Sequence, residues 1–428
     1  MRIALIVLSL FIAFPASAQL GRLPVGVPSL PPVAGLPVVG NLPGIVDRTE
    51  DAVGRLASRR LDQIDSLLSR HRDVLERSPD GDLIVRNQVV AMSPTPEALA
   101  AIQGAGFTVS ETQTLDGLGT QVVILTAPRG VSTKSALRKL QKLDPGGTYD
   151  FNDIYLGSQS ARGAAPGAVT QGEGGGRVGL IDGGVDAGHP AFRGAHVVQQ
   201  GFAGKAVPSE HGTATGSLLV GRADGFAGAA PGAELLVADV YCNSPTGGSS
   251  SAILQALDWM ARQQVAVINI SLVGPANGPM RVAIATLVKR GYLIVAAVGN
   301  DGPAAKPLYP AAFDGVVGVT GVDKRNKALL EAGRGPQVDF AAPGSDIAAA
   351  TPSGGYVAVR GTSFSAPIAA GLLAQRLPHP DPAQARAAVA ALSSGAVDLG
   401  AKGIDTTYGA GLVGNGIRPD IQTLKTKK

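Results

Sequence analysis

Four polar residues, far apart along the chain, each follow or open an apolar run and stand close to glycine. Asp182 ends VGLID before a Gly-Gly pair, His211 opens HGTATGSLLVG, Asn300 ends LIVAAVGN, and Ser363 lies in GTSFSAPIAAG. Taken singly, each has an ordinary structural interpretation, since serine caps helices and aspartate or asparagine holds turns. Taken together, they contain every group that acyl transfer requires.

The chemistry assigns a role to each of these four side chains. A serine hydroxyl such as that of Ser363 needs a base to remove its proton, and the neutral imidazole of His211 suits that task. A carboxylate, here Asp182, fixes the imidazole tautomer and stabilises its charged form. The oxyanion of the intermediate needs donors held in place, which the Ser363 backbone N–H at a helix start and the Asn300 amide can supply.

The elements that must position these residues follow from the hydrophobic pattern after Arg177. Helical segments alternate with runs that are apolar on both faces, as in buried parallel strands: VGLID, ELLVADVY, VAVINIS, LIVAAVGN and GVVGVTGV. We expect an α/β fold with an open, mostly parallel sheet and helices on both faces. Ligands of such sheets bind beyond the carboxyl ends of the strands, where Asp182 and Asn300 stand.

Four ordered motifs, DGGVDAGHP, HGTATGSLLVG, AAVGN and GTSFSAPIAAG, resemble those of the subtilisin-like (subtilase) serine proteases. The order Asp-His-Ser is also that of the family. The resemblance covers residues 177–416, which we expect to be the catalytic domain. It implies that Ser363 is the nucleophile, His211 the general base and then acid, Asp182 its orienting partner and Asn300 the side-chain oxyanion donor.

The resemblance also implies a substrate-binding surface. One stretch is similar to the family strand that pairs with the substrate backbone: Ser271, Leu272, Val273 and Gly274. Residues 296–299, which include Ala297 and Gly299, and the loop 304–308 would border the main specificity pocket. Val273 stands where a glycine is common and would narrow one subsite. Asp301 could favour basic substrate side chains.

A smaller unit precedes the catalytic domain. Residues 81–150 predict the order β-α-β-β-α-β, with a helix ended by glycine in TPEALAAIQGAG and a second in STKSALRKLQKL. This unit resembles the inhibitor-like propeptide of the family, which templates folding and then plugs the site with its C-terminal tail. The Gly-rich stretch 151–176 follows as a linker, and we expect the maturation cleavage to fall between Asp150 and Gly176.

The N-terminal residues predict export. Arg2, an apolar run and Ala16-Ser17-Ala18 have the layout of a signal peptide cut after Ala18, and the run is too short to span a bilayer comfortably. We therefore expect a secreted or periplasmic protein. Residues 19–47 predict a proline-rich linker, residues 48–80 an amphipathic helix, and residues 417–428 a solvated C-terminal tail.

The composition of the chain limits which partners the protein could bind. The net charge is +4 over 428 residues, without a dense basic run interleaved with aromatics, so we expect no nucleic-acid partner. No later stretch is long and apolar enough for a membrane helix, and we expect a soluble monomer that binds polypeptides and its own propeptide. The single cysteine, Cys242, cannot form an intramolecular disulfide and could lie near His211.

No cofactor is expected. The chain contains no C-x-x-C or H-E-x-x-H pairing, which argues against a catalytic metal. Ala191 stands after His-Pro, where many relatives carry an acidic calcium ligand, so no calcium site is assigned.

Other functions stay open at this point. A degenerate protease could capture peptides without cutting them, although all four catalytic positions are filled. An esterase or amidase could use the same triad, although the peptide-pairing strand favours a protease. A non-enzymatic extracellular scaffold, held by the proline-rich arm and the helix, is a further alternative.

Overall fold

The computed structural model describes residues 60–157, 161–165, 176–223, 225–352 and 354–425, with residues 161–165 described as backbone only. The elements below all lie within the unit Asp47–Lys428. The predicted signal peptide, the proline-rich linker and the start of the predicted helix over 48–80 lie outside the described residues.

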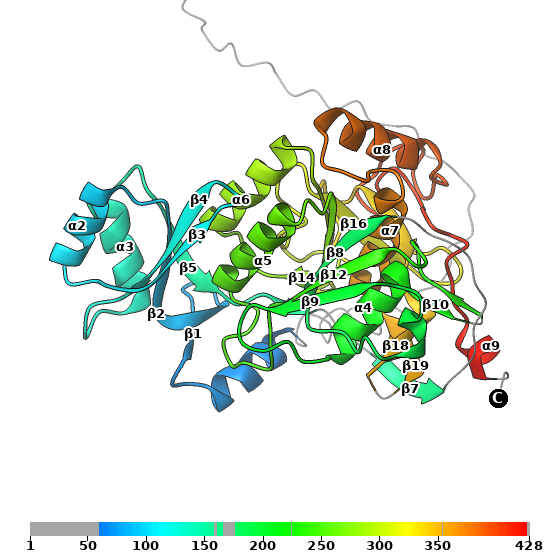
Figure 1. Cartoon of the computed structure of the whole chain (residues 1–428), viewed down its shortest axis with the longest axis horizontal. Coiled ribbons are helices and arrows are strands. Elements are labelled where there is room, and N and C mark those ends of the chain that lie inside the picture. Colours follow the sequence, from blue (N-terminus) through cyan, green and yellow to red (C-terminus); the bar gives the residue numbers. More distant parts are fainter. Residues whose placement is uncertain (1–59, 158–160, 166–175, 224, 353, 426–428) are drawn as a thin grey trace, which may run out of the picture. The chain divides into compact units, whose positions relative to one another are not determined.

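A seven-stranded sheet forms the centre of the C-terminal part (Figure 1). Its strands lie in the order β17 (Phe340–Pro343), β16 (Val317–Val322), β15 (Leu293–Ala297), β13 (Val267–Ile270), β8 (Arg177–Asp182), β12 (Glu234–Asp239) and β9 (Val197–Gly201). All neighbouring strands are parallel. The open parallel sheet is therefore confirmed, and each of the five apolar runs contains one strand. The two edge strands, β9 and β17, were not predicted, because β9 is half polar and β17 is short and ends in proline.

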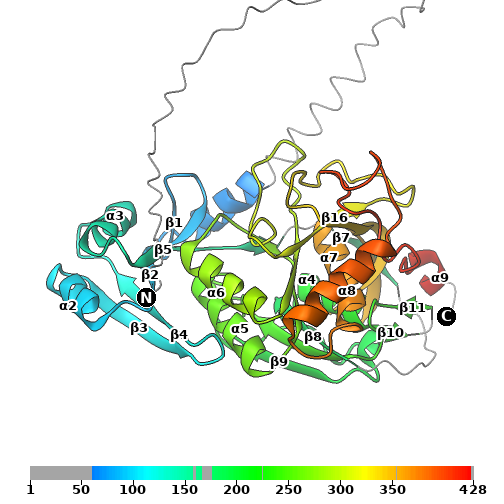
Figure 2. The same ribbon diagram turned by 90° about the horizontal axis from the view of Figure 1, so that it is seen from above.

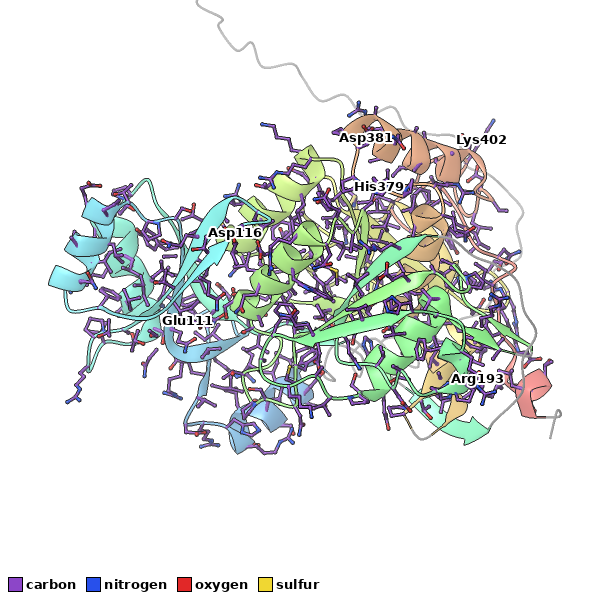
Figure 3. The ribbon with its side chains drawn as sticks, in the orientation of Figure 1. Glu111, Asp116, Arg193, His379, Asp381 and Lys402 are labelled. Atoms are coloured by element: carbon purple, nitrogen blue, oxygen red, sulfur yellow. The ribbon has the colours of Figure 1, made fainter. Side chains whose placement is uncertain are left out.

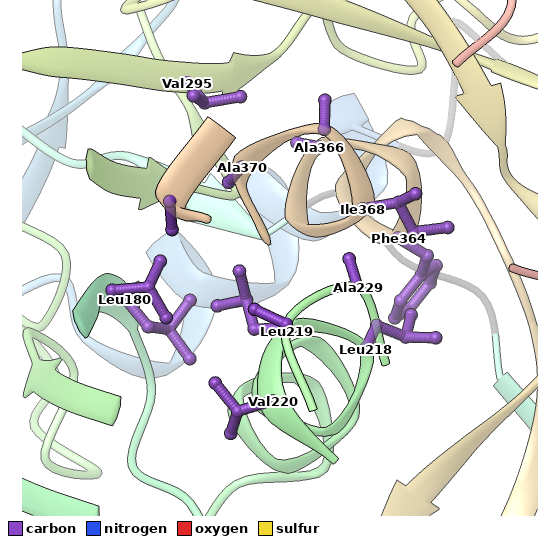
Figure 4. Close-up of a cluster of buried hydrophobic side chains, with 14 of the residues drawn as sticks. Leu180, Leu218, Leu219, Val220, Ala229, Val295, Phe364, Ala366, Ile368 and Ala370 are labelled. Carbon is purple, nitrogen blue, oxygen red and sulfur yellow. The ribbon is translucent and has the colours of Figure 1, made fainter. Parts of the chain in front are cut away.

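Helices cover both faces of this sheet, as predicted (Figure 2). On one face, α4 (Glu210–Val220) and α7 (Thr362–Ala374) share a buried cluster with the sheet, which Figure 4 shows closely. On the other face, α5 (Ser250–Arg262) and α6 (Gly278–Lys289) pack on a second cluster that contains Ile181. Leu180 belongs to the first cluster, so successive residues of β8 face opposite layers, as strand geometry requires.

The smaller unit that precedes the seven-stranded sheet, residues 75–153, contains a five-stranded sheet with two helices. Its elements follow in the predicted order: β2 (Leu83–Met92), α2 (Pro96–Gly104), β3 (Thr108–Leu115), β4 (Thr120–Thr126), α3 (Thr133–Leu143) and β5 (Thr148–Asp153). Strand β2 pairs antiparallel with both β4 and β5. The helices share a buried cluster with this sheet, to which Ile102 of α2 and Leu140 of α3 contribute.

The predicted helix over 48–80 is shorter than expected. Within the described residues it runs from 60 to 70, and β1 (Leu75–Arg77) follows as a strand paired with β2. Leu75 is fully buried in this pairing, and that burial overrides the helical pattern of the sequence. The helix over residues 60–70 buries Ile64 against Ile154 and Leu156, which lie just after the five-stranded sheet.

The C-terminal segment also differs from the prediction. Helix α8 (Pro382–Ser394) follows α7, and α9 (Ile421–Lys425) lies within the segment predicted to be a solvated tail. Leu424 of α9 is completely buried in the cluster shared with α4 and α7, so this part of the tail is anchored.

Several short elements complete the part of the chain that contains the seven-stranded sheet. They are η1 (Pro190–Phe192), β10 (Arg222–Ala223), β11 (Phe226–Ala227), β14 (Leu272–Val273), β18 (Ser345–Thr351) and β19 (Gly355–Arg360). Before them in the chain come β6 (Leu156–Gly157), which pairs with β14, and β7 (Ala161–Ala165), which pairs with β19.

Exposed charged side chains of both signs lie on different parts of the chain (Figure 3). Glu111 lies on β3, Arg193 follows η1, and Lys402 lies in the loop between α8 and α9.

Candidate active site

Asp182 and His211 meet where β8 ends and α4 begins. The Ser209 side chain caps α4 by accepting a hydrogen bond from the Gly212 N–H at 2.9 Å, which places His211 in the first turn. The His211 Nδ1 lies 2.8 Å from both carboxylate oxygens of Asp182. Asp182 is fully buried and also accepts hydrogen bonds from the Gly183 N–H at 2.7 Å and the Thr215 hydroxyl at 3.3 Å.

This pairing determines which imidazole nitrogen can act as a base. The carboxylate accepts the proton on Nδ1, which leaves a lone pair on Nε2. The Nε2 atom is buried and has no hydrogen-bond partner among the described residues. An orphaned buried acceptor is costly to a fold, so this nitrogen calls for a functional explanation.

Ser363 is the second residue of α7. Gly361 precedes the helix with φ of 138°, a backbone conformation that favours glycine. The Ser363 hydroxyl donates to the Ser271 carbonyl at 3.1 Å, and the Ser271 hydroxyl donates to the Ser363 carbonyl at 2.9 Å. The ring of Phe364, the next residue, lies 5.5 Å from the His211 ring between centroids. The first turns of α4 and α7 therefore face each other.

Asn300 is held at the same helix start. Its Oδ1 accepts a hydrogen bond from the Thr362 N–H at 3.0 Å, one residue before Ser363. Because the oxygen and nitrogen of the planar amide are held at a fixed angle to each other, this contact fixes the direction of the Nδ2 donor. The structure thus gathers Asn300 and Ser363 at the N-terminus of α7, and Asp182 and His211 at the facing end of α4.

The two segments predicted to border the main specificity pocket, residues 296–299 and 304–308, also lie close together. Ala297 ends β15 and is fully buried. Gly299 has φ of 96°, and a Cβ there would lie 2.7 Å from Leu308 Cδ1, so the two predicted segments touch. The positive φ favours glycine at this position.

The predicted substrate strand is already paired in this structure. Leu272 and Val273 form β14, whose antiparallel partner is β6, with Leu272 opposite Gly157 and Val273 opposite Leu156. On the other side, Ile154 is bridged to Ser249. The chain's own segment 154–157 therefore lies between β14 on one side and Ser249 on the other.

This segment reaches His211. A Cβ built on Gly157 would lie 3.7 Å from both Cε1 and Nδ1 of His211, an ordinary contact distance. A cavity of about 350 Å³ opens beside it, and its lining includes Gln63, Leu67, Gly157, Asp182, His211 and Cys242. Burial raises the pKa of the Cys242 thiol, so this cysteine is a poor nucleophile although it lies near His211 as expected.

Arg60 also reaches this region and was not found by sequence reasoning. Its guanidinium lies 3.6 Å from the Asp301 carboxylate and 3.5 Å from that of Asp82, and it donates to the Val273 carbonyl at 3.4 Å. Burial raises the pKa of Asp301, and the neighbouring Arg60 opposes that rise. A lone arginine near a helix start carries no sequence signal for such a contact.

Two polar side chains of β5 cap the starts of α5 and α6. The Asp150 side chain accepts from the Gly278 N–H at the start of α6, at 2.9 Å. The Asn152 Oδ1 accepts from the Ser251 N–H and the Ser250 hydroxyl at the start of α5, each at 3.1 Å. Helix N-termini favour such acceptors, so these contacts dock the smaller unit on α5 and α6.

Asp153 lies at the same boundary and is almost completely buried. It accepts a hydrogen bond from the Asn277 amide at 2.8 Å. Burial, together with the nearby charges of Asp150 and Asp82, holds the pKa of Asp153 well above its usual range.

No group of three or more His, Cys, Asp or Glu side chains is placed to hold a metal ion in the part of the chain that the structure describes. None of its helices is long and apolar enough to cross a bilayer.

Comparisons with known proteins agree with this geometry. The model of the subtilase family (Peptidase_S8) matches residues 174–411, more than half of the chain. Thermitase of Thermoactinomyces vulgaris is 32% identical over 236 residues, which cover 52% of this chain and 84% of thermitase. The minor extracellular protease Epr of Bacillus subtilis is 30% identical over 207 residues, or 47% of this chain but only 32% of Epr.

The fold comparison extends further along the chain. Fervidolysin from Fervidobacterium pennivorans, a keratinolytic enzyme related to subtilisin, matches with a TM-score of 0.65 over 82% of this chain and 62% of its own. At 18% identity this match concerns the fold alone. The family match and the thermitase alignment carry the assignment: the chain belongs to the subtilase family of serine proteases.

Proposed function

We propose that the protein is an exported serine endopeptidase, made as a zymogen that cleaves its own propeptide. Ser363 attacks the peptide carbonyl and forms an acyl-enzyme while His211 Nε2 takes its proton. The same imidazole then protonates the leaving amine, which departs as the new N-terminus. Water, activated by His211, releases the acyl group and restores the serine hydroxyl.

Asp182 and the oxyanion donors support this reaction. The buried Asp182 carboxylate, 2.8 Å from Nδ1, stabilises the imidazolium that forms during each transfer. The Ser363 N–H and the Asn300 Nδ2 group would donate to the oxyanion, where preorganised donors are worth more than in water. The Ser363 hydroxyl currently donates to the Ser271 carbonyl, and rotation about χ1 would redirect it towards Nε2.

The observation that carries the proposal is the pairing of the chain's own segment with the substrate strand. Residues 156–157 pair with β14 as a peptide substrate would, and Gly157 lies against the His211 ring. The capping contacts of Asp150 and Asn152 support the role of residues 81–157 as the propeptide. The contact with His211 favours a cleavage just after Gly157, at the start of the expected linker.

Expression of the full chain beside its Ser363→Ala variant tests this proposal. The wild type should lose its N-terminal region, with a new N-terminus close after Gly157, whereas the variant should keep that region, as measured by intact mass. Ser365→Ala is a matched control, because Ser365 is buried in the same helix and its hydroxyl donates to the Pro343 carbonyl. Equal processing of wild type and Ser363→Ala in a protease-free host would contradict self-cleavage.

The alternatives predict other results. A peptide-binding pseudoprotease would bind peptides but would not react with a serine-directed phosphonate. An esterase or amidase would cleave small substrates and leave proteins intact. A panel of protein and ester substrates separates these functions.

Export is proposed from the signal-peptide layout of the first 18 residues, and the extracellular location stated in the name of Epr supports it. The Ser363→Ala variant, which keeps its propeptide, should begin at Gln19 when it is recovered outside the cytoplasm. Retention of Met1 in the exported protein would contradict cleavage of a signal peptide.

A further inference from the structure

An ion pair holds the chain just before α7. The Glu331 side chain is buried, and its two carboxylate oxygens meet the Arg360 guanidinium, with Nε at 2.7 Å and Nη2 at 2.9 Å. Two parallel contacts of this kind fix the orientation of both side chains, which a single contact would not do. Arg360 is the last residue of β19 and precedes Ser363 by three positions. The pair therefore anchors the strand end that leads into the helix of Ser363.

The backbone around Glu331 holds the loop that carries Asn300. The Glu331 carbonyl accepts a hydrogen bond from the Gly302 N–H at 2.8 Å. The Gly333 N–H donates to the Gly299 carbonyl at 3.0 Å. These two bonds lie on either side of Asn300 and tie both ends of its loop to the segment that contains Glu331.

Glu331 thus joins the two segments that carry the proposed oxyanion donors. Its main chain holds the loop of Asn300, and its side chain holds the approach to Ser363. The direct link between these segments at the site is one hydrogen bond, from the Thr362 N–H to the Asn300 Oδ1 at 3.0 Å. An amide held by one such bond can pivot about it, so the ion pair adds a second constraint on the distance between the donors.

We infer that Glu331 and Arg360 are positioning residues that set the distance between the Asn300 Nδ2 group and the Ser363 N–H. The inference rests on the proposed peptidase function, in which these two groups donate to the oxyanion. Complete loss of an oxyanion donor lowers kcat by about 10²- to 10³-fold. A donor that is displaced but still present should cost less, about tenfold.

Self-cleavage of the full chain provides the test, because the segment to be cut is already bound and substrate affinity does not enter the rate. Loss of the precursor after refolding is followed by intact mass for the wild type, Arg360→Gln, Asn300→Ala and the double variant. Arg360→Gln should slow self-cleavage about tenfold in the wild type. In the Asn300→Ala background it should slow the reaction by less than about twofold, because the donor through which the pair acts is already absent.

A second variant and a control accompany this comparison. Arg360→Gln leaves the buried Glu331 carboxylate without its cation, which costs stability. Glu331→Gln removes the charge and keeps the size of the side chain, and it should show the same loss of rate and the same dependence on Asn300. Arg177→Gln is the matched control, because Arg177 pairs with Glu234 at 2.6 Å at the start of β8, and it should leave the rate unchanged.

The outcomes separate this inference from the function on which it rests. Equal slowing by Arg360→Gln with and without Asn300 would indicate a general structural effect and overturn the inference, as would unchanged rates in both Arg360→Gln and Glu331→Gln. An unchanged rate in Asn300→Ala overturns the oxyanion role of Asn300 and the inference with it, while the peptidase function stands. A wild-type chain that neither cleaves itself nor reacts with a serine-directed phosphonate overturns the proposed function.

Discussion

Replacing Asp182 by asparagine keeps the size of the side chain and removes its charge. In the structure one carboxylate oxygen accepts from the Gly183 N–H at 2.7 Å, and both oxygens face the His211 Nδ1 at 2.8 Å. In the variant, the amide oxygen should stay with the Gly183 N–H, which places the amide N–H group against the imidazole. The imidazole would then accept at Nδ1 and carry its proton on Nε2, where it cannot receive the Ser363 proton.

The expected effect is large because the tautomer is wrong in every turnover. Removing the charge from the aspartate of a serine-protease triad lowers kcat by about 10⁴-fold. That loss corresponds to about 5 kcal/mol of barrier at 1.36 kcal/mol per tenfold. The assay compares the rate at which the precursor disappears after refolding with the rate at which Ser363 reacts with a serine-directed phosphonate, for the wild type and Asp182→Asn.

Asp239→Asn is the matched control for this prediction. Asp239 lies opposite Asp182 in the β12–β8 pairing and is equally buried. Its carboxylate accepts from the backbone N–H groups of Tyr241, Cys242 and Val207, at 2.9, 2.8 and 2.8 Å, and so holds loops in place. We expect this variant to be destabilised but to stay within about tenfold of the wild-type rate. Asp182→Asn reacting as fast as Asp239→Asn would refute the assigned role.

Three further predictions concern docking of the propeptide, each measured in full-length Ser363→Ala protein so that the chain stays intact. Arg60→Ala removes a cation shared by two largely buried carboxylates. It should weaken docking of the propeptide by about 1–2 kcal/mol and speed limited proteolysis of the propeptide roughly 5- to 30-fold. An unchanged rate of proteolysis would show that the contact does not contribute to docking. Asn152→Ala removes an acceptor at the start of α5 and should lower the free energy of unfolding by about 1–2 kcal/mol, as measured with denaturant; no loss would contradict the capping role. The pKa of Asp153 is raised by burial and by neighbouring carboxylates, so the docked state binds its proton more tightly than the unfolded state. This contribution to stability is present below the ordinary carboxyl pKa and is lost as pH rises through the raised value. The free energy of unfolding should therefore decrease less between pH 4.5 and pH 7 in the Asp153→Asn variant than in the protein that keeps Asp153. Equal decreases in the two proteins would exclude this linkage.

Local sequence patterns were sufficient to predict most of the helices and strands of this protein. Fully apolar runs predicted the five inner strands of the parallel sheet, because a strand buried on both faces needs no polar residues. Helix starts and glycine ends predicted α2 and α3. The prediction failed where tertiary contacts decide the structure, as at Leu75, where pairing with β2 turns a helical pattern into a strand, and at Leu424, which packs into the main core.

For the candidate site, too, some features follow from the sequence and others only from the tertiary structure. Residue types and their order along the chain predict Asp182, His211, Asn300 and Ser363 as the catalytic residues, because acyl transfer needs those functional groups and each stands close to glycine at the end of a strand or the start of a helix. Only the tertiary structure showed that residues 154–157 occupy the cleft, that Tyr155 fills the space above Gly274, and that Arg60 reaches Asp301. Such contacts join residues more than a hundred positions apart. Their energy depends on distance in space and on exclusion of water, which no local pattern of residues records.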